Sequence, residues 1–223
     1  ANTTAGFSIV TWDASGVSTG TVAHGLTVAP DIIIAKARDY ATNWFVQVPD
    51  VLANTNMLNL ETTGASYNPG YNHFNDTVPT DEVFSFGGYL GGHSDLGSNT
   101  EKIAYCFHSV EGYSKVSKFT GNGNDNGPFV YTGFRPAWLM VKRTNSSGGW
   151  HMFDNKRAFA GNEIDVRLEA DNNDAENTSG PPHMDFVSNG FKMRTSFDNM
   201  NASGSTYIYL AFAEAPFKFA NAR

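Results

Sequence analysis

The chain has 223 residues and a net charge of −7 at pH 7, from 15 Lys and Arg against 22 Asp and Glu. This charge argues against duplex nucleic acid as the partner, because phosphate binding needs a basic surface. The single cysteine, Cys106, excludes an intramolecular disulfide framework and a four-cysteine zinc site. No apolar run approaches the roughly eighteen residues of a membrane span, and the first residues lack the regions of a signal peptide.

The composition favours short strands and tight turns over helices, since 22 residues are Gly and only 17% are charged. The first elements in the chain are strands over residues 7–12 and 19–23, joined by turn residues 13–16, which predicts a hairpin. Residues 32–35 are apolar on both faces and mostly β-branched, as in a strand that is covered on each side. The interior of a β-sandwich is the simplest place for such a strand.

The remaining elements follow the same pattern of short strands between polar or Gly-rich loops. Residues 62–79 and 87–99 are predicted to be the long loops of the first half. Residues 157–168 have weak helical spacing interrupted by Gly161 and Asn162, and are predicted to be coil or a short turn. Further strands are predicted at residues 44–48, 57–60, 83–86, 102–108, 138–143, 150–153, 186–193 and 207–213.

An internal repeat is visible in the sequence. Residues 30–36 (PDIIIAK) are followed by Trp44, and residues 136–142 (PAWLMVK) are followed by Trp150 at the same distance. The register needs no gap across this span, and a slip of one residue inside a strand would turn its core side chains outward. We therefore expect two tandem copies of a β unit with the same strand order.

The repeat predicts the fold class and the domains. We expect an all-β protein, a jelly-roll-like β-sandwich built from two tandem copies of a unit of about 105 residues that pack closely together. The first copy would span residues 1–111 and the second residues 112–223. In the last strand of each copy, alternate residues share one face, and these residues correspond between the copies. We therefore expect both copies to bury the face that carries Ile103, Tyr105 and Phe107 in the first copy and Ile208, Leu210 and Phe212 in the second.

Sequence motifs of catalysis and of cofactor binding are absent. The Gly-rich residues 121–127 lack the Lys-Ser or Lys-Thr of a phosphate-binding loop, and no nucleophile elbow or metalloprotease motif is found. We predict that the protein is not an enzyme and needs no cofactor or metal. An oxygen-rich loop with Asp171, Asp174 and Glu176 leaves calcium binding open, although a solvated surface loop is the interpretation we favour.

Two pairs of residues recur at equivalent positions of the copies. Trp44 and Trp150 are expected in the core, because the same residue type is retained in both copies. Lys36 and Lys142 end equivalent strands, and we expect their stems to lie along the sandwich rim with the ammonium in water. A paired anion site is the alternative for the two lysines.

Aromatic residues in the loops of the first copy have no counterparts in the second and are the predicted ligand-binding residues. Exposed aromatic rings stack on apolar faces of sugars or on protein partners, and the Asn and Asp side chains nearby supply hydrogen bonds. Folding of these rings back over the end of the sandwich is the alternative. The predicted site residues are Tyr40, Tyr67, Tyr71, His73, Phe74 and Tyr89.

Several segments of the second half resemble a domain found in tail fibre and related structural proteins of tailed bacteriophages. The resemblance covers nearly the whole chain and rests on segments such as 112–115 (GYSK), 127–138 (GPFVYTGFRPAW), 188–192 (SNGFK) and 209–217 (YLAFAEAPF). It implies an extracellular location in the virion and an all-β fold, and it transfers no catalytic residue.

With the loop aromatics, the resemblance implies a receptor-binding domain that contacts a host surface polysaccharide or an outer-membrane protein. Other virion proteins are expected partners, and the resemblance implies a homotrimer. One alternative is a purely structural virion part, such as a decoration, connector or capsid fibre protein. Another is a surface-polysaccharide depolymerase, which would need a carboxylate pair, for instance Asp76 and Asp81, at glycosidase separation.

Overall fold

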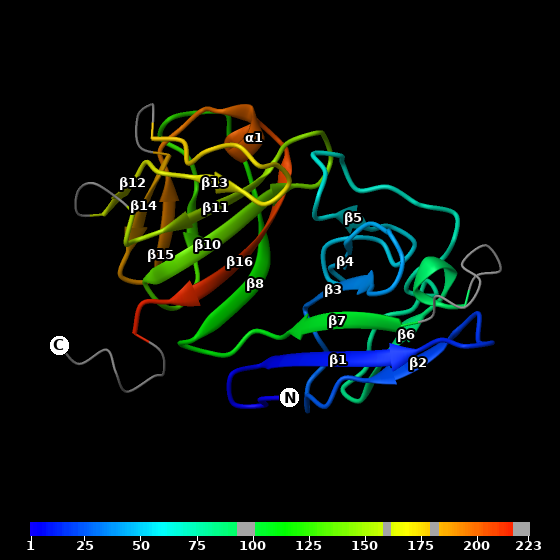
Figure 1. Cartoon of the computed structure of the whole chain (residues 1–223). Coiled ribbons are helices and arrows are strands. Elements are labelled where there is room, and N and C mark those ends of the chain that lie inside the picture. Colours follow the sequence, from blue (N-terminus) through cyan, green and yellow to red (C-terminus); the bar gives the residue numbers. More distant parts are fainter. Residues whose placement is uncertain (93–100, 158–161, 179–182, 216–223) are drawn as a thin grey trace. The chain divides into compact units, whose positions relative to one another are not determined.

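A computed structural model of the chain describes residues 1–92, 101–157, 162–178 and 183–215. The regular secondary structure of the described chain is almost entirely β, with antiparallel pairing in every sheet (Figure 1). It divides into two compact units. Unit 1 comprises Ala1–Leu60 and Ser66–Ser109, and unit 2 comprises Val110–Arg223 together with Glu61–Ala65. Among the described residues, no helix is long and apolar enough to cross a membrane.

Unit 1 contains a five-stranded sheet that faces a two-stranded ribbon. Its core contains residues of both, including Ile33 and Cys106 from the sheet and Phe84 from the ribbon. The order in the sheet is β1 (Phe7–Asp13), β7 (Glu101–Phe107), β3 (Ile32–Ala37), β4 (Phe45–Gln47) and β5 (Leu58–Asn59). The ribbon pairs β2 (Gly20–Ala23) with β6 (Val83–Phe86), and the 3-10 helix η1 (Gly88–Leu90) follows it.

Unit 2 contains a five-stranded and a four-stranded sheet whose inner faces share one core. The first sheet has the order β13 (Leu168–Glu169), β11 (Trp150–Asp154), β10 (Pro136–Arg143), β16 (Thr206–Ala213) and β8 (Ser114–Thr120). The second has the order β12 (Glu163–Ile164), β14 (Met184–Val187), β15 (Gly190–Met193) and β9 (Phe129–Tyr131). The short helix α1 (Asp198–Asn201) precedes β16.

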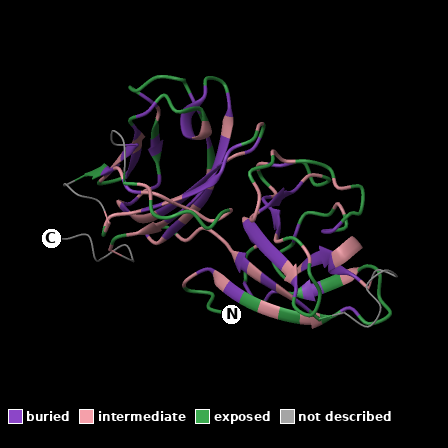
Figure 2. Cartoon of the chain, turned by 45° about the horizontal axis from the view of Figure 1, so that its top comes forward, coloured by how far each residue is buried: buried purple, intermediate pink, exposed green. Residues whose placement is uncertain are grey.

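The strand orders of the two five-stranded sheets correspond. In unit 1 the first strand, β1, pairs with β7, and β7 also pairs with β3. In unit 2 the first strand, β8, pairs with β16, and β16 also pairs with β10. This order agrees with the prediction from the sequence repeat, while the duplication itself remains our interpretation. The all-β sandwich class is confirmed, and Figure 2 shows many buried residues on the strands and many exposed ones on the loops.

The strand interiors show why these residues fold as they do. The first four residues of β3 are all buried, as the β-branched run predicted, and Ile33 and Ala35 reach the core of unit 1. Cys106 is fully buried beside them, and burial raises the pKa of its thiol to about 12. This cysteine is therefore a small apolar core residue rather than a reactive thiol.

Three local expectations are wrong. Residues 7–23 do not form a hairpin, because β1 pairs with β7 and β2 pairs with β6. Residues 186–193 are not one strand, since β14 and β15 form a hairpin that turns after Val187. The face of β7 that reaches the core carries Ala104 and Cys106, so Ile103, Tyr105 and Phe107 lie on its less buried face.

The face expected from the last strand of unit 2 is also not the one in its core. Tyr207, Tyr209 and Ala211 of β16 belong to the core cluster, although Ile208 and Leu210 are buried as well. Both units therefore bury the same parity of residues, which is the opposite parity to the one we expected. A strand covered on both sides gives no alternation by which the sequence could show its inner face.

Candidate functional site

The predicted aromatic residues of unit 1 converge on a hollow of about 320 Å³, which we call the aromatic hollow. Three segments form it: the β3–β4 connection with the start of β4, the long loop after β5, and η1. Five of the six predicted site residues line it, so the structure brings together residues that lie far apart in the sequence. The lining residues are Tyr40, Ala41, Thr42, Asn43, Phe45, Tyr67, Pro69, Tyr71, His73 and Tyr89.

His73 contacts several of the other aromatic rings that line the hollow. Its side chain is only 3% exposed, and its ring centroid lies 4.1 Å from that of Phe45, 5.4 Å from that of Tyr89 and 6.2 Å from that of Tyr71. The backbone N–H of Tyr89 donates to His73 Nδ1 at 3.1 Å, so in neutral imidazole the ring proton is on Nε2. The histidine therefore fixes the rings around it, while the tyrosines present the accessible surface.

The tyrosines at the opening are the exposed aromatic residues of the lining. Tyr71 is 52% exposed, Tyr40 39% and Tyr67 38%, whereas most large apolar side chains of unit 1 are buried. The Tyr67 hydroxyl is bonded to the side chain of Asn59, whose amide donates to it at 3.0 Å. This contact orients the Tyr67 ring before any ligand arrives, which lowers the entropy cost of binding.

Gly88 allows η1 to approach the loop that carries Tyr71 and His73. Its φ is +50°, and a Cβ atom at this position would lie 2.2 Å from the Tyr71 carbonyl oxygen and 2.5 Å from His73 Nδ1. The neighbouring Gly87 N–H donates to the His73 carbonyl at 2.8 Å. A left-handed backbone and a close approach together require glycine here. The hollow thus depends on the Gly-rich start of a loop predicted from composition alone.

Phe74 is the predicted site residue that does not reach the hollow. It is 4% exposed and packs in the core of unit 1, so it cannot contact a ligand. The interpretation that loop aromatics fold back over the sandwich therefore applies to Phe74. Its neighbour His73 is also buried, but it lines the hollow as well. Most of the second predicted recognition loop, residues 93–99, lies outside the described residues.

Sequence reasoning missed Thr42, Asn43, Phe45 and Pro69. The sequence indicates Phe45 only as part of a strand, and its ring packs against that of His73 at an interplanar angle of 32°. Thr42 and Asn43 belong to the polar turn of residues 39–43 after β3, and their position close to Tyr40 is the signal that could have identified them. Polar loop residues beside an exposed aromatic residue are the pattern that would have found them.

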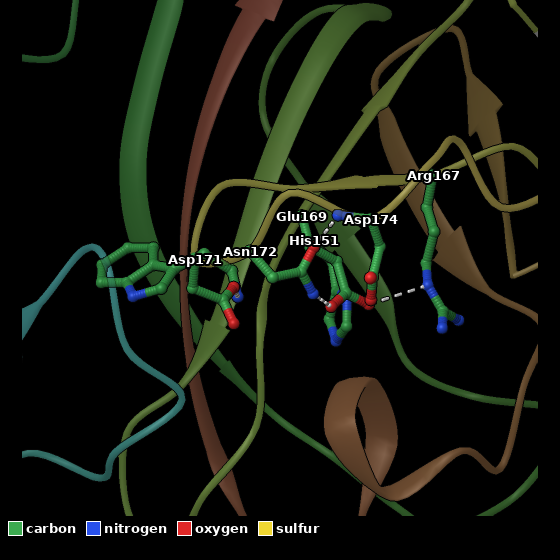
Figure 3. A network of polar contacts seen from close by, with 7 residues as sticks. His151, Arg167, Glu169, Asp171, Asn172 and Asp174 are labelled. Carbon is green, nitrogen blue, oxygen red and sulfur yellow. Dashed lines mark hydrogen bonds and ion pairs between the residues drawn. The ribbon is translucent and has the colours of Figure 1, made fainter.

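The oxygen-rich loop of unit 2 forms a polar network rather than a metal cage (Figure 3). Glu169 accepts from Arg167 Nε at 3.2 Å and from Asn172 Nδ2 at 2.7 Å, and Asn172 in turn accepts from the Asp174 N–H. Asp171 Oδ1 accepts from the Trp150 N–H at 2.5 Å. Within the described part of the chain, no three His, Cys, Asp or Glu side chains are grouped so that they could hold a metal ion.

Comparison with known proteins places the chain in one family. The family model described as "Domain of unknown function (DUF7483)" matches residues 1–216. The chain belongs to the DUF7483 family. No curated protein and no solved structure matches it. The DUF7483 region covers both units, so the aromatic hollow and the polar network lie within it.

The equivalent lysines of this DUF7483 chain have different environments. Lys36 is half-buried and donates to the Thr42 carbonyl at 2.6 Å. Lys142 is completely buried, which corrects the prediction of a rim position. Its Nζ donates to the carbonyls of Gly64 at 2.8 Å and Arg143 at 2.7 Å, and burial lowers its pKa to about 8. Nearby carbonyl acceptors allow an ammonium to lie there.

The two tryptophans differ in the same way. Trp150 is 1% exposed, as expected for a core residue, whereas Trp44 is only half-buried. The Trp44 ring lies 6.2 Å from that of Tyr105, and Lys36 Nζ lies 5.6 Å from its centroid. Assignment of Trp44 to the core is therefore wrong, and a residue type retained in both copies does not guarantee equal burial.

Two buried histidines are a feature of unit 2 that sequence reasoning did not single out. His151 is 1% exposed and His183 is 6% exposed, and no described residue makes a hydrogen bond to either ring. Burial lowers the pKa of each to about 4, and the Arg167 guanidinium acts in the same direction. Glu169 Oε1 lies 3.2 Å from His151 Nδ1 without forming a hydrogen bond. Both histidines are thus neutral core residues at pH 7.

Proposed function

We propose that the chain is a receptor-binding domain of a bacteriophage tail fibre that binds host surface polysaccharide through the aromatic hollow. The observation that carries the proposal is the convergence of exposed tyrosines from separate loops on one hollow of suitable size. Ligand sites in proteins are concave, mostly apolar surfaces with a few polar groups, and occupy about 300–1,000 Å³. The virion context comes from the resemblance to tail fibre proteins.

The chemistry of the lining suits a sugar better than a flat protein surface. Aromatic rings pack against the C–H faces of a pyranose, and tyrosine hydroxyls supply hydrogen bonds at the ring edge. Thr42 and Asn43 add polar groups on the side formed by the β3–β4 connection. No Asp or Glu is among the lining residues that the structure describes, so these residues supply no carboxylate pair of the kind a depolymerase needs. The geometry therefore favours binding over cleavage.

Replacing Tyr71 by Ala is the first test of this proposal. We expect the affinity for polysaccharide extracted from the host surface to fall on the order of ten-fold, because about 1.4 kcal/mol of stacking and apolar contact is lost. Tyr71 is 52% exposed, so the melting temperature should change little. Isothermal titration calorimetry and a thermal melt measure the two effects. His73 is left intact, because its burial would confuse binding with folding.

Tyr131→Ala is the matched control. Tyr131 lies on β9 of unit 2, is 66% exposed, and does not line the hollow. Its removal should leave polysaccharide binding unchanged. The purified chain should also block phage adsorption to host cells, and the Tyr71→Ala chain should not. Equal polysaccharide binding by the wild-type and Tyr71→Ala chains would place the site elsewhere. If the wild-type chain neither bound polysaccharide nor blocked phage adsorption, a purely structural virion protein would be favoured.

We also propose that the working unit is a homotrimer in the virion. The support is the resemblance to tail fibres, together with avidity: linking three shallow sites raises the effective concentration of the second and third contacts. Light scattering on the parent fibre protein should give the mass of three chains, each of which contributes the 24.2 kDa of this region. A monomeric mass at high protein concentration would contradict the trimer without affecting the sugar site.

A further inference from the structure

The part of the aromatic hollow's lining that the structure describes has no charged side chain of the carboxylate, ammonium or guanidinium type. None of these ten residues is Asp, Glu, Lys or Arg, and their one imidazole, His73, accepts a hydrogen bond from a backbone N–H. Lys36 is a charged residue that bonds to the lining without lining the hollow itself. Its ammonium donates to the Thr42 backbone carbonyl and lies 5.6 Å from the centroid of Trp44. The structure therefore directs this cation at protein atoms.

An uncharged lining disfavours charged sugars. A uronate, sialate or phosphate group is recognised by Arg or Lys, usually through paired charge-assisted hydrogen bonds. Without such a partner, the charge would lose part of its hydration on entering the hollow and gain little in return. The net charge of −7 on the chain adds repulsion against an anionic polymer at low ionic strength. An ammonium sugar likewise meets no carboxylate among the described lining residues.

The groups that the hollow does offer suit a hydroxyl-bearing ring. The rings of Tyr40, Tyr71 and Tyr89 present apolar faces with a hydroxyl at the edge, and the Tyr71 and Tyr89 rings meet at 58° with centroids 5.3 Å apart. Such an angle forms a corner in which one face of a sugar can lie against one ring and its edge against the other. A volume of about 320 Å³ is at the lower limit of ligand sites, which limits the occupant to one or two sugar rings.

From these observations we infer that the hollow selects an electrically neutral pyranose, a hexose or N-acetylhexosamine unit, over acidic and amino sugars. This inference rests on the proposed function and names the substrate class of the same site. Recognition depends on ring faces and hydroxyl groups, so it should vary little with ionic strength. A site that bound an anionic glycan would instead lose affinity as salt is added.

The test compares two sets of oligosaccharides of equal length on the full chain. One set contains neutral hexose and N-acetylhexosamine units, and the other contains uronate or sialate units; both are titrated by calorimetry at low and high NaCl. We expect at least one neutral oligosaccharide to bind on the order of ten-fold more tightly than any acidic one, with an affinity that salt changes less than two-fold. The Tyr71→Ala chain should lose this binding.

The outcomes separate this inference from the proposed function. Tighter binding of an acidic oligosaccharide that still requires Tyr71 would overturn neutral selectivity and leave the sugar site standing. Absence of binding by either set, together with no binding of host polysaccharide, would overturn both. Neutral binding that survives Tyr71→Ala would contradict the assignment of the hollow.

A designed change of charge gives a second, independent measurement. Asn43 is exposed and lines the hollow, so Asn43→Lys places an ammonium beside the sugar without altering the core. Binding of uronate oligosaccharides should rise several-fold, whereas neutral binding should stay within about three-fold. Asn173→Lys, at an exposed loop position of unit 2, is the control with the same change in net charge. An equal gain from both substitutions would show a general charge effect and contradict the assignment.

Discussion

Acidification from pH 6.5 to pH 4 is expected to destabilise unit 2, because His151 and His183 are buried in their neutral form. Burial lowers the pKa of each from 6.5 to about 4, so in this interval the unfolded chain binds protons that the folded chain does not. Stability is therefore complete above pH 6.5, falls as the pH decreases, and levels off below about pH 4. The expected loss is on the order of 3 kcal/mol for each histidine.

The charges that face these histidines do not remove the effect. The positive charges of Arg167 and Lys142 oppose the protonation of His151, as does His183 once it is itself protonated, while Asp171 favours protonation to a smaller extent than burial opposes it. Glu169 lies 3.2 Å from His151 Nδ1, yet burial still decides the direction of the shift. For His183, Asp165 is the favouring charge, and Arg167 opposes.

Hydrogen exchange of the β16 amides at several pH values measures this loss within unit 2. His151→Gln and His183→Gln, singly and together, should each flatten the dependence of unfolding free energy on pH, even if they lower stability at pH 7. His108→Gln is the control, since His108 is a half-buried residue of unit 1. An unchanged slope in the double variant would show that other groups cause the acid sensitivity.

Replacement of Asn201 by Ala should cost unit 2 about 3–5 kcal/mol, since several buried hydrogen bonds would be lost together. Asn201 is fully buried at the end of α1. Its Nδ2 group is within hydrogen-bond distance of the Thr195 carbonyl at 2.7 Å and the Asn124 carbonyl at 2.8 Å, and its Oδ1 accepts from the Asn122 N–H at 2.9 Å. Without this amide, the Asn-rich turn would lose its attachment to α1. Chemical denaturation followed by intrinsic fluorescence measures the change.

Asn199→Ala is a matched control on the same turn of helix. Asn199 is half-buried, so the same substitution there should cost well under 1 kcal/mol. If both variants lost the same stability, the effect would come from helix propensity, and the buried network would not be responsible. Asn201→Asp should be no better than Ala, because a carboxylate cannot donate to the Thr195 and Asn124 carbonyls.

Local patterns predicted most strands and failed where pairing is long-range. The buried strand β3 and the ribbon strand β6 were predicted at or near their observed positions, because their apolar runs end at recognisable turns. The turn after β1 was also visible, yet turn residues do not say which strand is the partner. The partner of β1 is β7, which lies at the other end of unit 1. Only the fold as a whole determines such a pairing.

The site was partly predictable for a related reason. Tyr40, Tyr71 and Tyr89 stood out as aromatic residues among turn formers, which is a local signal. The same signal selected Phe74, and nothing in its neighbourhood shows that this ring turns into the core. The roles of His151 and Asn201 depend on burial, which a polar residue in a loop or beside a short helix does not reveal in sequence.

The assignment of Glu61–Ala65 to unit 2 means that the protein cannot be divided by a single cut in the chain. A fragment that begins at Val110 retains Lys142 but loses the Gly64 carbonyl that accepts from its ammonium, and the Thr63 carbonyl that accepts from the Gly148 N–H. A fragment that ends at Ser109 carries these acceptors without their donors. Dissection into two halves after Ser109 therefore leaves unit 2 with a buried cation short of an acceptor, and a fragment of unit 2 holds both partners in one covalent chain only if it begins no later than Thr63.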